Sequence, residues 1–225
     1  MKRLVIPYVE LDFEDVKGIS DAIGSLRGGL EIGNLPWVEN YSYKPDVRFM
    51  AFYTDRGIIV KYSVREKSVR AMYGEDNQPV YEDSCVEFFF SPGDDKNYFN
   101  FEFNCIGTLL AQYGSGRNDR EFIDSELLQS VGRYSTLGNE TFPERKGISG
   151  DGFEWELTVT IPFSLVFSVA GFRGGIDGLK EVGGRGNFYK CGDKLSTPHY
   201  LSWSMIETPQ PDFHRPEFFG EIVFG

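Results

Sequence analysis

Two segments alternate between apolar and mostly polar side chains, and this period of two constrains the fold of the 225-residue chain more than any other feature. In residues 153–161 every second side chain is apolar, and the side chains between them are glutamates and threonines. Residues 57–65 show a similar alternation. A period of two is typical of a β-strand with one face on a core and the other in water. Both segments are therefore predicted strands of an antiparallel sheet.

Short strands of this kind are predicted along most of the chain. With 20 Phe, 12 Tyr, 26 Gly and 11 Pro, the composition favours short strands joined by tight turns. Residues 84–91 and 97–105 form a predicted hairpin around a turn at residues 92–96. The regular spacing indicates an all-β fold, a single antiparallel β-sandwich of jelly-roll-like type. The remaining predicted strands are 47–53, 107–113, 131–137, 185–189, 200–206 and 218–224.

The first 36 residues are predicted to be an N-terminal extension that packs on a sandwich formed by residues 37–225. Apolar side chains recur in this extension at Val16, Ile19 and Ile23, a spacing near that of a helical turn. We therefore expect a short helix over residues 13–26. A second short helix is expected at residues 119–129.

The charge balance restricts the possible partners. Lys and Arg total 23 against 34 Asp and Glu, and the formal charge of −11 repels phosphate backbones, so nucleic acid is not an expected partner. The longest mostly apolar run, residues 161–172, is shorter than the roughly 20 residues of a membrane span, and we expect no membrane association. The protein is expected in the cytoplasm if Met1 is the native start, and outside the cell if a signal peptide has been removed.

The sequence lacks the catalytic and cofactor-binding motifs of several common enzyme classes. The two histidines, His199 and His214, lack the spacing of a zinc hydrolase. The sequence also has no nucleophile elbow, phosphate-binding loop or dinucleotide-binding turn. Because no CxxC spacing occurs, we expect the three cysteines to be free buried thiols: Cys85, Cys105 and Cys191.

One predicted strand carries a polar row opposite a row of phenylalanines. Along residues 98–105, Asn100, Glu102 and Asn104 share the face that the aromatic side chains do not use. Across the predicted hairpin, Glu87 lies beside this row. Such donors and acceptors suit a hydroxyl-rich ligand, because each hydroxyl both donates and accepts. The same pattern also fits the solvated face of an ordinary antiparallel sheet.

Four segments, in this order, resemble the family 9 carbohydrate-binding modules. They are residues 81–89 (YEDSCVEFF), 98–104 (YFNFEFN), 153–163 (FEWELTVTIPF) and 212–224 (DFHRPEFFGEIVF). The resemblance implies a single β-sandwich that holds a mono- or oligosaccharide between two aromatic rings. It also implies a structural role for calcium, for which residues 94–97 offer oxygen ligands, and no cofactor is required otherwise.

The resemblance also assigns roles to single residues. Tyr81 stands where the family has its first stacking ring, a tryptophan, and Glu87 matches a sugar-binding acidic residue. Asn104 matches an amide on the following strand, and Glu102 stands where a basic residue is expected.

The second stacking ring is expected just before the terminal strand. Phe213 and His214 are the candidates, and its position favours Phe213. Trp203 alternates with Met205 on one strand face, so we expect it in the core. His199 is expected to be a hydrogen-bonded structural residue.

Two other functions stay open beside a non-catalytic sugar-binding module of carbohydrate catabolism. A glycoside hydrolase would use Glu87 and Glu102, since opposed residues on neighbouring strands bring two carboxyl groups to about 5 Å, the separation in retaining glycosidases. An open sheet face, however, is expected to leave both carboxylates solvated and ionised, without the raised pKa that a general acid needs. The other alternative is a sandwich that has lost its ligand and serves protein interaction.

Overall fold

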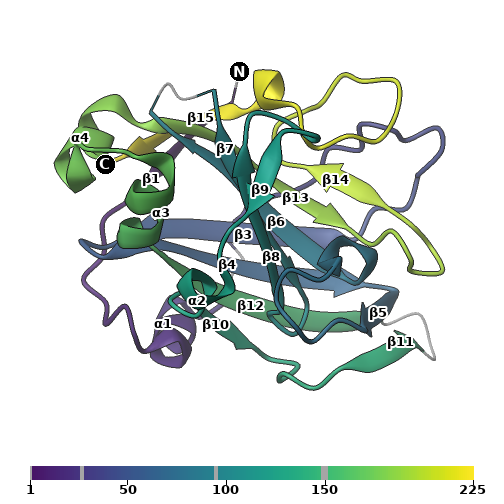
Figure 1. Cartoon of the computed structure of the whole chain (residues 1–225). Helices are drawn as coiled ribbons and strands as arrows, with labels where there is room; N and C mark the ends of the chain where they lie inside the picture. The colour runs from purple at the N-terminus through teal and green to yellow at the C-terminus, as the bar shows by residue number, and fades with distance from the viewer. Residues whose placement is uncertain (1, 26–27, 94–95, 148–151) are drawn as a thin grey trace.

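Two β-sheets face each other across one hydrophobic core in the computed structural model, which describes residues 2–25, 28–93, 96–147 and 152–225 (Figure 1). Neighbouring strands are antiparallel except at one edge, where β1 runs parallel to β15. The antiparallel β-sandwich predicted from the sequence is thus confirmed. The larger sheet has the order β1 (Arg3–Ile6), β15 (Gly220–Phe224), β13 (Gly184–Cys191), β6 (Cys85–Pro92), β7 (Tyr98–Asn104), β8 (Leu109–Gly114) and β9 (Arg120–Phe122), with β14 (Tyr200–Ser202) also paired to β13.

The smaller sheet contains the two segments with the strictest alternation. Its order is β10 (Gly132–Ser135), β12 (Phe153–Pro162), β4 (Gly57–Glu66), β3 (Asp46–Tyr53) and β2 (Leu30–Glu31). A separate two-stranded ribbon, β5 (Ser68–Ala71) with β11 (Phe142–Lys146), was not predicted.

Four α-helices accompany the sheets in the described part of the chain: α1 (Val16–Ile23), α2 (Ser125–Leu128), α3 (Phe163–Ala170) and α4 (Gly175–Val182). The predicted N-terminal helix corresponds to α1, whose N-cap Asp15 accepts a hydrogen bond from the Gly18 amide at 2.9 Å. The helix predicted at residues 119–129 is wrong in its first part, where β9 forms, and only the single turn α2 is helical. No described helix has the length and apolar character needed to cross a membrane.

The N-terminal 36 residues contribute strands to both sheets. β1 joins the edge of the larger sheet and β2 the edge of the smaller one. Leu4 and Ile6 of β1 are buried in the common core. The chain therefore uses this segment to complete its sheets.

Aromatic rings fill the space between the two sheets. Phe188 of β13 stacks on Phe49 of the opposite sheet, with ring centroids 3.9 Å apart, and on Phe88 of β6 at 4.6 Å. Trp203 lies in the same core, as predicted. The three cysteines are free and buried, also as predicted.

The outer face of the larger sheet is not solvated. The interpretation of the polar row on β7 as the solvated face of an ordinary antiparallel sheet was therefore wrong. Asn100, Glu102 and Asn104 are at most 3% exposed. Loops from distant parts of the chain cover this face and form a second, smaller apolar cluster on it, which contains Trp37, Val80, Cys85, Phe89, Tyr98, Leu110, Tyr189, Cys191, Ile206, Phe213 and Phe219.

A buried ion pair connects the two sheets. Lys190 Nζ of β13 lies 2.9 Å from Glu66 Oε2 at the end of β4, and both side chains are fully buried. Lys190 also donates to His199 Nε2 at 2.8 Å, while Trp155 Nε1 donates to Glu66 Oε1 at 2.7 Å. His199 is thus a structural, hydrogen-bonded residue, as predicted. Burial lowers its pKa well below the ordinary value and keeps the ring neutral.

The variant Lys190→Met tests this connection. It leaves Glu66 buried without its cation, so we expect the free energy of unfolding to fall by about 3–5 kcal/mol. Denaturant unfolding measures this change. The matched control is Arg3→Met, which breaks an exposed pair with Glu221 and should cost less than about 1 kcal/mol. Equal losses in the two variants would contradict a special role for the buried pair.

Candidate functional site

A cavity of about 460 Å³ opens on the covered outer face of the larger sheet. Its floor is formed by side chains of the three central strands, β13, β6 and β7. Its walls come from the loops before β6, β9 and β15 and from Tyr41, in the loop between β2 and β3. Five of the six candidate residues predicted from the sequence line this cavity: Tyr81, Glu87, Glu102, Phe213 and His214.

Aromatic side chains form much of the wall. Tyr81, on the turn of residues 80–82, is 38% exposed, so its ring is available to a ligand. Tyr41 and Tyr200 meet edge to face, with ring centroids 4.8 Å apart. Phe213 is only 9% exposed and stacks on Tyr189 at 4.2 Å, so it offers little free ring surface. Tyr41 and Tyr200, which are partly buried, also line the cavity and add to its aromatic surface.

Two carboxyl groups lie side by side on the cavity floor. Glu87 of β6 and Glu102 of β7 are directly paired in the sheet register, and both are at least 97% buried. Glu87 Oε1 accepts from Cys191 Sγ at 3.1 Å, and Glu102 Oε1 accepts from Asn100 Nδ2 at 2.8 Å. Within the described residues, the other oxygen of Glu102 has no hydrogen-bond partner. This leaves an acceptor position available to a ligand in the cavity.

Burial changes the protonation of these acids. It raises the pKa of Glu87 well above its ordinary value, and the neighbouring charge of Glu102 raises it further. Burial likewise raises the pKa of Glu102 to about 7, and that of Asp193 at the cavity edge to about 6. The expectation of solvated, ionised carboxylates was therefore wrong, because covering loops remove water from this sheet face.

Cations balance part of this acidity. Arg117 and Arg120 line the cavity, and Arg120 Nη1 lies 2.6 Å from His214 Nδ1. The Tyr98 hydroxyl lies 3.0 Å from the same nitrogen. Burial, together with the charge of Arg120, lowers the pKa of His214 to about 2. His214 is thus a neutral support for Arg120.

Asn104 is the predicted site residue that the structure places elsewhere. It does not line the cavity, and its fully buried amide donates to the Tyr73 carbonyl at 2.8 Å and to Asp83 Oδ2 at 3.1 Å. Its oxygen accepts from the Thr108 amide at 2.9 Å. With both its nitrogen and its oxygen occupied, Asn104 shapes the turn that follows β7.

Several lining residues were missed by sequence reasoning. Arg117, Arg120 and Asp193 lie in or beside loops, where no periodicity indicates which way a side chain points. Tyr41 lies in the aromatic stretch of residues 37–43, and this clustering was the available signal.

Ligand side chains for a metal converge at one place in the described residues. This is the group of Cys85, Glu87 and Cys191, and its thiols do not suit calcium, which takes oxygen ligands. Of the calcium ligands predicted at residues 94–97, Asp94 and Asp95 lie outside the described residues. Structural calcium therefore stays a prediction.

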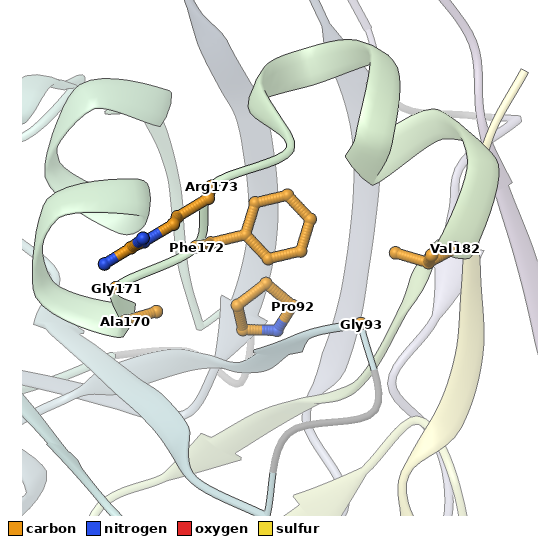
Figure 2. A pocket seen from close by; sticks show the side chains of 7 residues that line it. All are labelled: Pro92, Gly93, Ala170, Gly171, Phe172, Arg173 and Val182. Carbon is orange, nitrogen blue, oxygen red and sulfur yellow. The ribbon is translucent and has the colours of Figure 1, made fainter.

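A second hollow, of about 680 Å³, lies beside α3 and α4 and has a different character (Figure 2). Its lining includes Pro92, Phe172 and Val182, and its charged member, Arg173, extends away from them. It has no set of convergent polar groups like that on the floor of the first cavity. The cavity above Glu87 and Glu102 is thus the better candidate for a polar ligand.

The stability of the protein should depend on pH through Glu102. Its folded pKa of about 7 exceeds the ordinary 4.5, so the folded state keeps a proton that the unfolded chain releases. The stabilisation is full below about pH 4.5 and is lost as the pH rises through about 7, by at most about 3 kcal/mol.

Denaturant unfolding between about pH 5 and pH 8 measures this slope. Glu102→Gln should reduce it, with Glu87 and Asp193 supplying the slope that remains, whereas Glu121→Gln, on the exposed edge strand β9, should keep the wild-type slope. If the free energy of unfolding of Glu102→Gln kept the wild-type dependence on pH, the raised pKa of Glu102 would be contradicted.

Comparisons with known proteins agree with this geometry. The sequence matches the family model of carbohydrate-binding family 9 over residues 28–224. It is 39% identical to a candidate carbohydrate-binding protein from Bacteroides uniformis, with a TM-score of 0.85 over 100% of this chain and 99% of that one. A search of curated proteins finds no match.

The fold is also shared with more distant structures. A family 9 module from Caldicellulosiruptor kristjanssonii in complex with glucose is 15% identical, with a TM-score of 0.56 over 100% of this chain and 96% of that one. A family 9 module from the same organism in complex with cellotriose is 13% identical, with a TM-score of 0.50 over 99% and 93%. On the strength of the family match across nearly its whole length, the chain belongs to carbohydrate-binding family 9.

Proposed function

We propose that this protein is a non-catalytic module that binds a mono- or oligosaccharide in the cavity above Glu87 and Glu102. The observation that carries the proposal is the meeting of the exposed Tyr81 ring and two partly buried tyrosine rings with a floor of buried carboxyl groups in one cavity. A sugar ring has apolar faces that pack on an aromatic ring and hydroxyls that need donors and acceptors. The cavity offers both kinds of contact.

The protonation of the floor suits hydroxyl groups. Burial raises the pKa of Glu87 and so favours its protonated form, which can donate, while the free oxygen of Glu102 can accept. Arg117 and Arg120 add donors at the rim. Because hydrogen bonds to water are exchanged for hydrogen bonds to protein, we expect a dissociation constant between about 1 mM and 1 µM, or about 4–8 kcal/mol.

The remaining volume of the cavity also supports ligand binding. A sandwich that had lost its ligand and served protein interaction would be expected to fill the site with side chains. Here about 460 Å³ remains, and a carboxylate oxygen faces no protein donor within the described residues. Glucose and cellotriose, the ligands of the C. kristjanssonii modules, are therefore suitable first probes.

The first test is a titration with glucose, cellotriose and a panel of other sugars by calorimetry or NMR. We expect at least one sugar to bind, and Tyr81→Ala to weaken that binding by about tenfold or more, because the ring contact is lost. Phe122→Ala is the matched control, since Phe122 is 59% exposed but does not line the cavity, and it should bind like wild type. Folded wild-type protein that responds to no sugar would refute the proposal.

One observation favours a second candidate function, glycoside hydrolysis. Glu87 and Glu102 are paired on neighbouring strands and have raised pKa values, as a general acid requires. Family 9 modules are, however, generally non-catalytic binding domains, and the proposed function needs no turnover.

Incubation with aryl glycosides and natural oligosaccharides separates the two functions. We expect no product from the wild type beyond the level given by the double variant Glu87→Gln with Glu102→Gln. Hydrolysis that is present in the wild type and lost in either single variant would instead establish an enzyme that uses this pair.

A further inference from the structure

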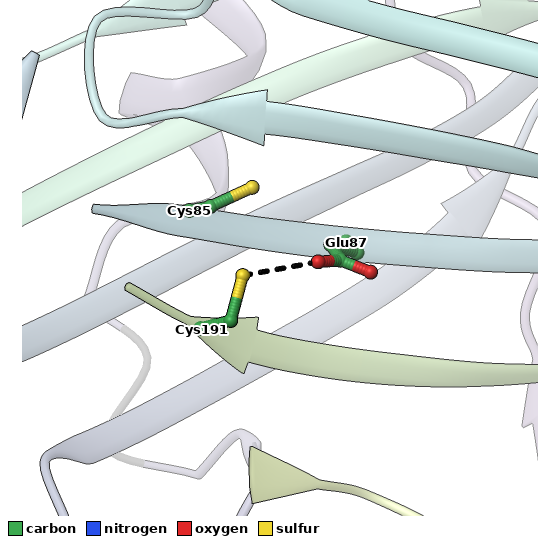
Figure 3. Close-up of side chains that lie close together, drawn as sticks. All are labelled: Cys85, Glu87 and Cys191. Carbon is green, nitrogen blue, oxygen red and sulfur yellow. Dashed lines mark hydrogen bonds between the residues drawn. The ribbon is translucent and has the colours of Figure 1, made fainter. Parts of the chain in front are cut away.

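A cluster of two thiols and a carboxyl group lies at the cavity floor (Figure 3). Cys85 of β6 and Cys191 of β13 are direct partners in the sheet register, and Glu87 follows two residues later on the same face of β6. The three ligand atoms lie within 4.8 Å of one another, and all three residues are at least 98% buried. Cys191 Sγ points at Glu87 Oε1 from a distance of 3.1 Å.

We propose that Cys85, Cys191 and Glu87 form a binding site for a thiophilic divalent cation of the Zn²⁺ type. Two sulfurs and one carboxylate oxygen are a ligand set that Zn²⁺ accepts in tetrahedral sites. Zn–S bonds of about 2.3 Å and Zn–O bonds of about 2.1 Å place sulfur and oxygen about 3.5 Å apart across a tetrahedral angle. The observed 3.1 Å differs from this by a few tenths of an ångström, so small side-chain shifts suffice.

The cation would have an entry path and a free coordination position. Cys191 and Glu87 line the cavity, whereas Cys85, the register partner of Cys191, does not. The fourth position of a tetrahedral ion then faces the cavity, where water or a ligand hydroxyl completes the set. This site does not rest on sugar binding, although it shares Glu87 with the proposed sugar contact.

Binding of the cation changes the protonation and the net charge of the three ligands. Two thiols and one carboxyl group release three protons as the divalent cation binds, and the loaded site carries one net negative charge. Lys190 and Arg120 are cations near enough to interact with these groups. The third thiol, Cys105, lies apart from this site and donates to the Arg70 carbonyl at 3.4 Å, which makes it a suitable control.

Titration of the reduced full-length protein with Co²⁺ tests the site. We expect one equivalent to give visible d–d bands and a thiolate-to-cobalt charge-transfer band, and added Zn²⁺ to bleach both. Cys85→Ser and Cys191→Ser should each reduce the charge-transfer intensity by about half or weaken binding by about 100-fold or more. Cys105→Ser should behave like wild type.

A second measurement keeps the test valid if a serine variant fails to fold. In wild-type protein at a denaturant concentration just below the unfolding transition, where buried thiols react through local opening, one equivalent of Zn²⁺ should slow the alkylation of Cys85 and Cys191 but not that of Cys105, as identified by mass spectrometry. Glu87→Gln should weaken Zn²⁺ binding by about tenfold or more while leaving both thiols in place. Absence of the charge-transfer band in folded, reduced wild type, equal protection of all three thiols, or a Cys85–Cys191 disulfide in anaerobically prepared protein would overturn the proposal.

Discussion

The buried ion pair of Lys190 and Glu66 connects the two sheets, and it determines which side chains of β13 face the cavity. A buried charge that loses its partner is strongly destabilising, so the pair restricts how β13 can lie against β4. Because side chains alternate along a strand, Lys190 facing the core obliges Tyr189 and Cys191 to face the cavity side. A shift of the β13 register by one residue would turn its core-facing side chains toward the cavity and its cavity-facing side chains toward the core. The core interaction therefore determines which side chains form the cavity floor.

The larger sheet is buried on both faces, and this explains the chemistry of the site. Its inner face packs the phenylalanines of β6, β7 and β13 against the smaller sheet, while loops cover the outer face with a second apolar cluster. Glu87 and Glu102 lie between these layers with little water around them, and so their pKa values rise. A polar row that would be ordinary on a solvated sheet becomes a set of dry hydrogen-bonding groups. Ligand contacts made there compete less with solvent.

Sequence analysis predicted most accurately the strands and core residues that follow from the alternation of side chains along a strand. The strands at residues 57–65 and 153–161, the inward row of Phe99, Phe101 and Phe103, and the buried Trp203 follow from side-chain alternation alone. Helix α3 was missed because its apolar side chains leave no clear polar face, and β1 because its pairing with β15 joins opposite ends of the chain. The burial of Glu102 was missed for a related reason, since alternation identifies a face of the sheet but not the distant loops that cover it.

The acidic side chain at position 102, where the family resemblance predicts a basic one, has a physical explanation in the pairing with Glu87. Two ionised carboxylates in direct register would repel, but burial and this repulsion both raise the pKa of Glu87 and so favour a protonated carboxyl group beside Glu102. A carboxyl group beside a carboxylate then presents one donor and several acceptors at the same place. A basic side chain can only donate, and Arg117 and Arg120 already supply that function at the rim. The pair therefore provides the acceptors that the arginines lack, and a hydroxyl, which both donates and accepts, can use the two kinds of group together.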